Sequence, residues 1–389
     1  MSLALITSSL AVHQAVAQPE PTPDPQISFA REVRSHEYYV DQAGLWWAQT
    51  QQNPKDENAW YQYYRACRNA QGTANWSTDF VNEADYLRLG PDIIALMEEE
   101  IPGSFTLQFI KGSHQGVSTE NSEFILKAYR QNPYFEDLLA DVVSYAHASH
   151  NPELRREANI KWHDHGDWPD GFLTFGYNQL VSVPKNGILL VSGDNDTYPA
   201  WMLQDALGIR TDVKVLNIDF FLNPDYAKAE LKDLGMPELE LPPIDVNDYE
   251  KNWVSVVNHL LENRSPETEI VLSATLSPRW YKNVSKDVKR TGAVFSLTME
   301  KEEAFERNAA LVRDKMRWDN FGLPLSEPRG QGRIDQLNQT LLESLGHAYQ
   351  WETQKGSAEI AETYKSIARD YLYRKHSVEE SDKMIKDLF

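Results

Sequence analysis

Three acidic residues follow short apolar runs in the middle of the chain. Asp194 and Asp196 come shortly after the run 187–191, and Asp219 comes directly after the run 213–218. The carboxyl ends of neighbouring parallel strands meet at one edge of a sheet, so these carboxylates are expected to lie close together. Carboxylate oxygens are the ligands that hard cations prefer. The three residues are therefore candidate ligands for Mg²⁺ or Ca²⁺.

The same stretch also fits a purely structural role, which is the favoured interpretation. Asp194 and Asn195 are typical of a tight turn, and Asp196 or Thr197 is suited to cap the helix that follows. With the polar residues after a third apolar run, the candidate ligand-binding residues at this edge are Asp194, Asn195, Asp196, Thr197, Asp219, Thr275 and Ser277.

A histidine cluster lies upstream, within the segment 162–168. His163, His165 and Asp167 have the His-x-His-x-Asp spacing of zinc hydrolases, and imidazoles two residues apart on an extended segment can face one metal. The complete dinuclear pattern needs a further histidine where Trp168 stands, and no strand precedes the cluster. A solvated polar turn is the favoured interpretation.

No other motif supplies the chemistry of an enzyme. The chain has neither G-x-S-x-G nor the phosphate-binding G-x-x-x-x-G-K-[ST]. Its first apolar run is followed by one glycine, Gly193, where a dinucleotide fingerprint needs three. Catalytic residues are therefore not identified, and the sequence leans towards a protein that is not an enzyme. No cofactor is expected to be required, and Mg²⁺ or Ca²⁺ is the one candidate cofactor.

The elements that would position these residues alternate between strand and helix. Short apolar runs bounded by turn residues are typical of strands buried on both faces, and helical patterns separate them. The expected strands are 187–191, 213–218, 269–273 and 292–297, and the expected helices are 198–207, 225–234, 252–262 and 280–289. This alternation predicts an α/β fold in which a small Rossmann-like parallel-sheet domain spans residues 184–300.

Helical patterns flank this domain on both sides. Stops that contain Pro or Gly at Asn53-Pro54, Gly90-Pro91, Pro102-Gly103, Asn132-Pro133 and Asn151-Pro152 divide residues 29–160 into a helical-hairpin region. The segment 53–64 resembles a joint between two tetratricopeptide units. Leu342, Leu345, Gly346 and Tyr349 follow the tetratricopeptide spacing in residues 334–389, where Ala358 is expected at a packed small-residue position and Gly346 at a close helix contact.

Aromatic residues crowd the first of these hairpins. At helical spacing they are expected to form a packing seam rather than a sugar-stacking platform. They are Trp46, Trp47, Trp60, Tyr61, Tyr63 and Tyr64. Cys67 lies in the same pattern and is expected to be a small buried hydrophobe.

The remaining boundaries follow from composition. An apolar stretch ending in Ala15-Val16-Ala17 predicts a signal peptide over residues 1–17, and four prolines follow it in a tether over 18–28. A connector is expected over 161–183, and a helix with a linker over 301–333. The chain is therefore expected to be secreted or periplasmic, or to lie at the cell surface.

Charge and hydropathy exclude other classes. The net charge of −20 repels phosphate backbones, so nucleic acid is not an expected partner. No run approaches the roughly 20 apolar residues of a membrane-spanning helix, so no transmembrane segment is expected and the mature protein is predicted to be soluble. The single cysteine leaves no internal disulfide.

The segment 193–199 carries a resemblance. Its Gly-Asp-Asn-Asp-Thr-Tyr-Pro sequence, the following Trp201-Met202-Leu203-Gln204 and the segment 208–213 are similar to the soluble domain that follows the membrane helices in bacterial protein O-mannosyltransferase-like envelope proteins, a family of largely unknown function. The likeness covers about residues 184–300. It implies a Rossmann-like fold, an envelope setting and a candidate site at the same segment. It does not imply glycosyl transfer, which belongs to the membrane-embedded half of that family.

Two functions from different classes follow. The leading hypothesis is a secreted or periplasmic binding or scaffold protein of the bacterial envelope, presenting a protein or glycan surface on its tetratricopeptide-like helices. The alternative is a divalent-metal-dependent hydrolase, with Asp194 and Asp196 as metal ligands and Asp219 as a third ligand or base. The oligomeric state, the ligand and the identity of the partner do not follow from the sequence.

Overall fold

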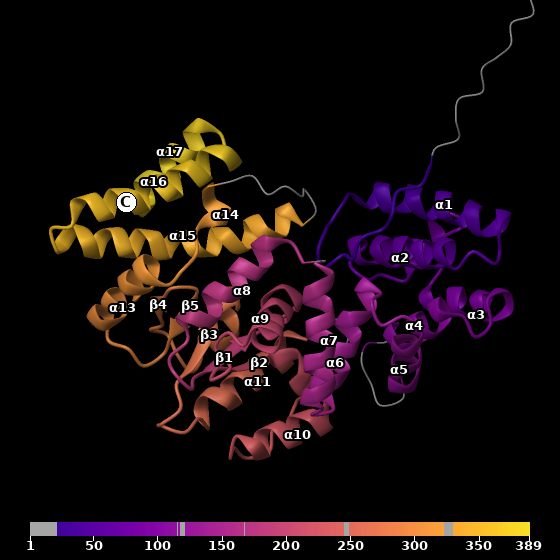
Figure 1. Cartoon of the computed structure of the whole chain (residues 1–389), viewed down its shortest axis with the longest axis horizontal. Helices are drawn as coiled ribbons and strands as arrows, with labels where there is room; N and C mark the ends of the chain where they lie inside the picture. Colours follow the sequence, from indigo (N-terminus) through magenta and orange to yellow (C-terminus); the bar gives the residue numbers. More distant parts are fainter. Residues whose placement is uncertain (1–21, 115, 117–120, 167, 245–248, 323–329) are drawn as a thin grey trace, which may run out of the picture.

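The structure is a computed structural model, and it describes residues 22–114, 116, 121–166, 168–244, 249–322 and 330–389. Helices dominate these ranges, with a small sheet near the middle of the chain (Figure 1). The predicted signal peptide at 1–17, the first part of the predicted tether and most of the predicted linker near 323–329 lie outside the described residues. No helix of the described ranges combines the length and the apolar character that a membrane span requires.

Helices fill the N-terminal region. They are α1 (His36–Gln52), α2 (Glu57–Thr73), α3 (Gly90–Glu100), α4 (Phe105–Ser113), α5 (Ser122–Gln131), α6 (Glu136–Ala148), α7 (Pro152–His165) and α8 (Asp170–Ser182), with a 3-10 turn η1 (Asp79–Asn82). The predicted stops with Pro or Gly all lie at the ends of these helices. Helices α1 and α2 form a hairpin in which the Asp56 carboxylate caps α2 and the Trp60 indole donates a hydrogen bond to the Pro54 carbonyl at 2.9 Å.

The expected packing seam is confirmed in this hairpin. Trp60, Tyr61, Tyr63 and Tyr64 are buried, and Trp46 and Trp47 pack against the same core. Cys67 is buried among them, and burial raises the pKa of its thiol to about 12.

The sheet is mixed rather than parallel. Its strands are β1 (Ile188–Val191), β2 (Lys214–Asn217), β3 (Ile270–Ser273), β4 (Lys289–Thr291) and β5 (Val294–Ser296), in the order β2-β1-β3-β5-β4. β1 pairs in parallel with β2 and β3, whereas β5 is antiparallel to both β3 and β4. The predicted α/β fold with a Rossmann-like parallel-sheet domain is therefore wrong. The described chain is mostly helical and carries one small mixed sheet.

The error arises between β3 and β5. The predicted helix over 280–289 shrinks to one turn, α12 (Pro278–Tyr281), and the chain returns as β4. A two-residue turn at Gly292 and Ala293 then reverses it into β5, and Gly292 adopts φ +66°, which a glycine at that place permits. A hairpin cannot make the crossover that a parallel strand needs, so β5 runs antiparallel.

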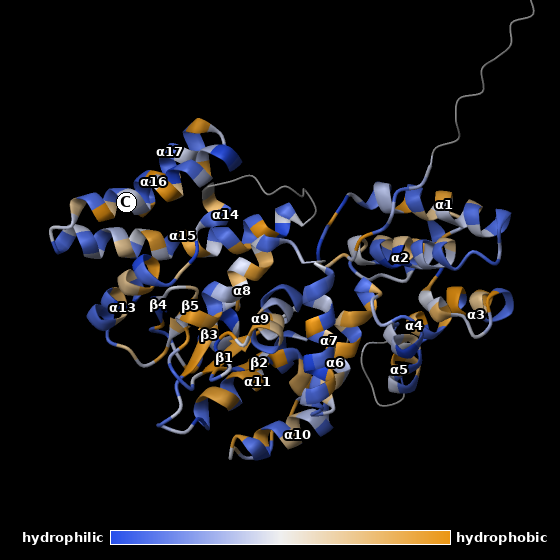
Figure 2. Ribbon diagram, in the orientation of Figure 1, coloured by the Kyte–Doolittle hydropathy of each residue, from blue (hydrophilic) through white to orange (hydrophobic). Residues whose placement is uncertain are grey.

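Helices cover both faces of the sheet. Leu189 and Val191 of β1 join a large core shared with the N-terminal and C-terminal helices, whereas Ile188 and Leu190 join a second core with α10 (Pro224–Asp233) and α11 (Glu250–Glu262). Helix α9 (Asp194–Leu207) follows β1 and packs against α7 and α8, and a 3-10 turn η2 (Ile218–Leu222) follows β2. The apolar strands between these layers stand out in Figure 2.

The C-terminal helices are α13 (Lys301–Asp314), α14 (Asp319–Gly322), α15 (Gln331–Gln354), α16 (Ala358–Lys375) and α17 (Val378–Leu388). Gly346 makes the close contact expected of it, because a Cβ there would lie 2.8 Å from the Leu388 carbonyl oxygen. The expectation for Ala358 is wrong: this residue begins α16 and is exposed, and Ala361 takes the buried small-residue position.

Candidate functional site

Asp219 holds the turn that follows β1. Its carboxylate accepts hydrogen bonds from the Gly193 N–H at 2.9 Å and from the Ser192 hydroxyl at 3.2 and 3.3 Å. The ends of β1 and β2 are thus joined through a carboxylate, as their parallel pairing leads one to expect. These bonds commit Asp219 to the architecture of the turn.

Asp196 joins α9 to the end of β3. Its side chain is buried and accepts hydrogen bonds from the hydroxyls of Ser273, at 3.3 Å, and Thr275. Burial raises the pKa of Asp196 to about 7, and the two hydroxyls oppose this shift. The structure therefore brings Asp196 and Thr275 together.

The helix after β1 starts earlier than the predicted cap. Asp194 is its first residue, and Gly193, at φ +79°, occupies the cap position without a side-chain bond. Neither Asp196 nor Thr197 caps α9. Thr197 instead donates a hydrogen bond to the Gly193 carbonyl at 2.6 Å and accepts one from Asn217 at 3.0 Å.

Among the three acidic residues at the strand ends, Asp194 is the one exposed to solvent. Solvent reaches its side chain, while partial dehydration by the surrounding protein, followed by the charge of Asp219, raises the pKa of Asp194 to about 6. Its neighbour Asn195 points to the N-terminal segment, where its amide donates to the Ala30 carbonyl at 3.1 Å. Ser277 precedes α12 and makes no side-chain cap there.

The candidate metal sites at the strand ends and at the histidine cluster remain predictions. Among the described residues, no group of three or more His, Cys, Asp or Glu side chains is arranged to hold a metal ion. His163 and His165 lie in the last turn of α7, where residues two apart point to different sides of the helix. Asp167 lies outside the described residues.

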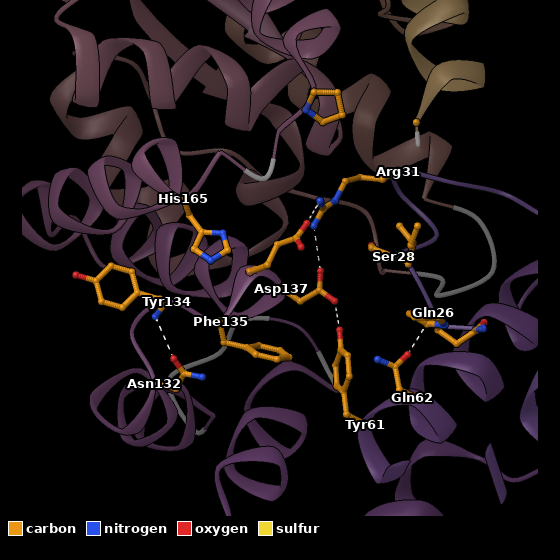
Figure 3. Close-up of a pocket in the computed structure, with 15 residues that line it drawn as sticks. Gln26, Ser28, Arg31, Tyr61, Gln62, Asn132, Tyr134, Phe135, Asp137 and His165 are labelled. Atoms are coloured by element: carbon orange, nitrogen blue, oxygen red, sulfur yellow. Dashed lines mark hydrogen bonds and ion pairs between the residues drawn. The ribbon is translucent and has the colours of Figure 1, made fainter. Parts of the chain in front are cut away.

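A cavity of about 390 Å³ opens in the N-terminal helical region (Figure 3). Part of its wall is formed by residues 24–31, which have neither helix nor strand and end in a turn at 29–31; we call this segment the strap. The other walls come from α2, from the start of α6 and from the end of α7. Its lining includes Arg31, Tyr61, Tyr134, Phe135, Glu136 and Asp137.

The charges along the cavity compensate one another. Arg31 of the strap pairs with Glu136 and, at 3.1 Å, with Asp137, and Tyr61 donates its hydroxyl proton to Asp137 (Figure 3). Arg65 of α2 reaches the same Asp137 at 2.9 Å. This network links two segments about one hundred residues apart and fixes the polar groups of the cavity.

A further carboxylate, Asp141, lies one helical turn beyond Asp137. Burial raises its pKa to about 7, and the charges of Arg65 and Arg68 oppose this shift. The charges of Asp137 and Asp194 add to this rise in the pKa of Asp141. Titratable groups shifted in this way gather at functional sites more often than elsewhere.

A family model matches the middle of the chain. Residues 173–316 match the family model of TMEM260-associated domain 2. The match spans the sheet together with most of α8 and all of α13, so it is wider than the predicted domain 184–300. No curated protein sequence matches the chain significantly.

One solved structure shows a distant likeness. The crystal structure of yeast Tom70 aligns with 91% of this chain at 11% sequence identity and a TM-score of 0.25. The chain spans 58% of the length of that protein. At this TM-score the alignment does not establish a common fold.

Proposed function

We propose that this protein is a non-enzymatic binding protein of the bacterial envelope, secreted or periplasmic, and that its N-terminal helices bind a partner protein. The observation that carries the proposal is the open cavity beside the strap, about 390 Å³ in volume. A glycan is the second kind of ligand that the sequence allows.

The lining of the cavity suits a protein ligand. Tyr134 is 55% exposed at its edge, and Phe135 lies beside it. Exposed aromatic side chains next to compensated charges are typical of binding hot spots, because they offer a large apolar area without burying an unpaired charge. The bonds of Arg31, Glu136 and Asp137 hold the polar part of the wall in place before a ligand arrives.

The envelope setting rests on the sequence alone. The predicted signal peptide lies outside the described residues, and the resemblance to the soluble domain of O-mannosyltransferase-like envelope proteins points to the same compartment. Secretion is tested directly by locating the full chain in fractionated cells, where this proposal expects it outside the cytoplasm.

The binding proposal is tested with the full chain as bait in an extract of bacterial envelope. Tyr134→Ala removes the exposed ring at little cost to folding, and Tyr373→Ala, at a residue 41% exposed on α16, is the matched control. We expect a partner that binds the wild type and the control but not Tyr134→Ala. A partner that resists protease and is lost after periodate treatment would identify a glycan. Equal recovery on all three baits would contradict the proposal.

A hydrolase at the strand ends is the second candidate, and the open carboxylate of Asp194 favours it. Asp194 is accessible to solvent, and its pKa near 6 suits a group that exchanges protons at neutral pH. Asp196 and Asp219 lie beside it, and Mg²⁺ or Ca²⁺ is the cation that such oxygens would hold.

The hydrolase is tested by thermal unfolding of the full chain with and without Mg²⁺ or Mn²⁺. This candidate expects the cation to raise the melting temperature of the wild type but not of Asp194→Asn. The absence of a shift in the wild type, or the same shift in the variant, would exclude it.

A further inference from the structure

The strap lies across the N-terminal helices as a bound peptide would. The described chain from Thr22 to Gln26 has no helix or strand, and a short turn at 29–31 follows it. Its contacts reach α1, α2, α9 and α6 in succession. A segment of the chain thus occupies a groove that four separate helices form.

Side chains of the helices recognise the main chain of the strap. Gln42 accepts from the Asp24 N–H at 2.7 Å, and the Trp46 indole donates to the Asp24 carbonyl at 2.9 Å. Gln62 accepts from the Gln26 N–H at 2.5 Å. Further along, Asn69 donates to the Ile27 carbonyl at 2.9 Å, and Asn195 donates to the Ala30 carbonyl. Bonds of this kind do not depend on the side chains of the bound segment.

One side chain of the strap supplies specificity. The Arg31 guanidinium lies between Glu136 and Asp137 and stacks over the ring of Trp168 at 5.7 Å. A planar guanidinium with two carboxylates and an indole face is a combination that lysine does not reproduce. The groove therefore reads an extended main chain together with one arginine.

The strap does not use the full capacity of this groove. Asn69 is completely buried, and its side-chain oxygen has no hydrogen-bond partner among the described residues. The side-chain oxygen of Asn195 is also buried without a hydrogen-bond partner among the described residues. The cavity also leaves open space along Pro25, Ile27 and Ser28. Both amides that hold the main chain of the strap thus keep an unpaired acceptor, and an unpaired buried acceptor is costly.

We propose that the strap occupies a peptide-binding groove in cis, and that the partner protein presents an extended segment whose arginine takes the place of Arg31. This inference rests on the proposed protein-binding function and names the chemistry of the ligand. The partner segment must displace the strap, so the strap weakens binding until it is released.

The test uses the full chain and two fluorescent peptides in an anisotropy assay. One peptide has the sequence of residues 22–34, and the other carries Ala in place of Arg31. The chains are the wild type, Arg31→Ala, which loosens the strap, and Arg34→Ala, whose mostly exposed side chain pairs with Glu32 within the same segment. We expect the first peptide to bind Arg31→Ala about tenfold or more tightly than either other chain, and the alanine peptide to bind none of them.

Asn69→Ala in the Arg31→Ala chain gives a second measurement. It removes a main-chain contact of the groove and is expected to weaken the first peptide again. If the Arg31→Ala chain keeps its circular dichroism spectrum but binds both peptides equally, or neither, the inference is wrong. If the Arg31→Ala chain forms a concentration-dependent dimer, the occupant of the groove is a second copy of this chain and not a partner protein, and the inference is also wrong. Loss of the envelope partner on Tyr134→Ala without any peptide binding would overturn this inference alone.

Discussion

The strand-end edge of the sheet and the cavity of the N-terminal helices both contain carboxylates, but they use them differently. At the edge, Asp219 and Asp196 accept hydrogen bonds from the chain's own turns and strand ends. In the cavity, Glu136 and Asp137 bind a segment that comes from far away in the sequence. The edge is therefore built mainly as architecture, whereas the cavity already binds an extended segment.

The largest expected effect concerns the aromatic residues of the helical region. Trp60→Ala should lower the free energy of unfolding by about 3–5 kcal/mol, because it removes a buried indole and leaves a void in the core. Tyr134→Ala should change it by less than about 0.5 kcal/mol, because that ring is mostly exposed. Urea unfolding of both variants measures the difference. Similar values would mean that the cavity edge is part of the core.

The next effect separates two carboxylates at the edge. Asp219→Ala should cost about 1–3 kcal/mol, because the Gly193 N–H and the Ser192 hydroxyl lose their acceptor. Asp194→Ala is the matched control, and we expect a change within about 0.5 kcal/mol, because the described structure gives that side chain no architectural hydrogen bond. Thermal and urea unfolding of both variants measure these losses. A larger loss of stability in Asp194→Ala than in Asp219→Ala would contradict the structural role of Asp219.

The stability of the chain is expected to depend on pH through the buried carboxyl of Asp196. An unfolded aspartate has a pKa of about 3.9, whereas the pKa of folded Asp196 is about 7. Between these values the folded chain holds a proton that the unfolded chain has lost, so the contribution of this residue to stability falls as the pH rises from about 4 to about 7 and levels off above that. His147 has the opposite effect on stability. Burial lowers its pKa, so below its ordinary pKa the unfolded chain binds a proton that the folded chain does not, and the stability rises with pH.

Asp196→Asn isolates the contribution of Asp196. The stability of this variant relative to the wild type should rise from pH 5 to about pH 7 and level off towards pH 8, because the variant has no proton to lose. Urea unfolding at four pH values measures this difference. A relative stability that is flat with pH would show that the carboxyl titrates normally in the folded chain.

The smallest effect is chemical rather than energetic. The buried thiol of Cys67, with its pKa raised to about 12, should not react with an aromatic disulfide reagent at pH 8 until the chain unfolds. Absorbance of the released thiolate, with and without denaturant, reports this. Rapid reaction of the native chain would show that the first hairpin opens easily.

Much of the architecture follows from local sequence patterns. The continuous apolar run at 187–191 predicts a buried strand, and β1 forms there because both faces of the sheet are covered. Stops such as Asn53-Pro54 predict helix ends because proline removes a donor and clashes with the preceding turn. Asp219 was expected near the turn after β1, since the parallel pairing of the strands places it there.

The remainder depends on contacts between distant segments. β4 has no apolar pattern, and its Arg290 is buried only because Glu343 and the ring of Phe295 surround its guanidinium. The sequence does not indicate the cavity, because the pairing of Arg31 with Asp137 leaves no local pattern. The proline-rich composition near residue 24 indicated a tether, although its main chain is held by Gln42 and Trp46.

The most direct test of the account compares Tyr134→Ala and Asp194→Asn in one binding assay with the envelope partner. Both residues are exposed, so neither change is expected to disturb folding. If the binding surface lies on the helical cavity, Tyr134→Ala abolishes binding and Asp194→Asn retains it. Loss of binding on Asp194→Asn with full retention on Tyr134→Ala would place the site at the strand ends and contradict the account.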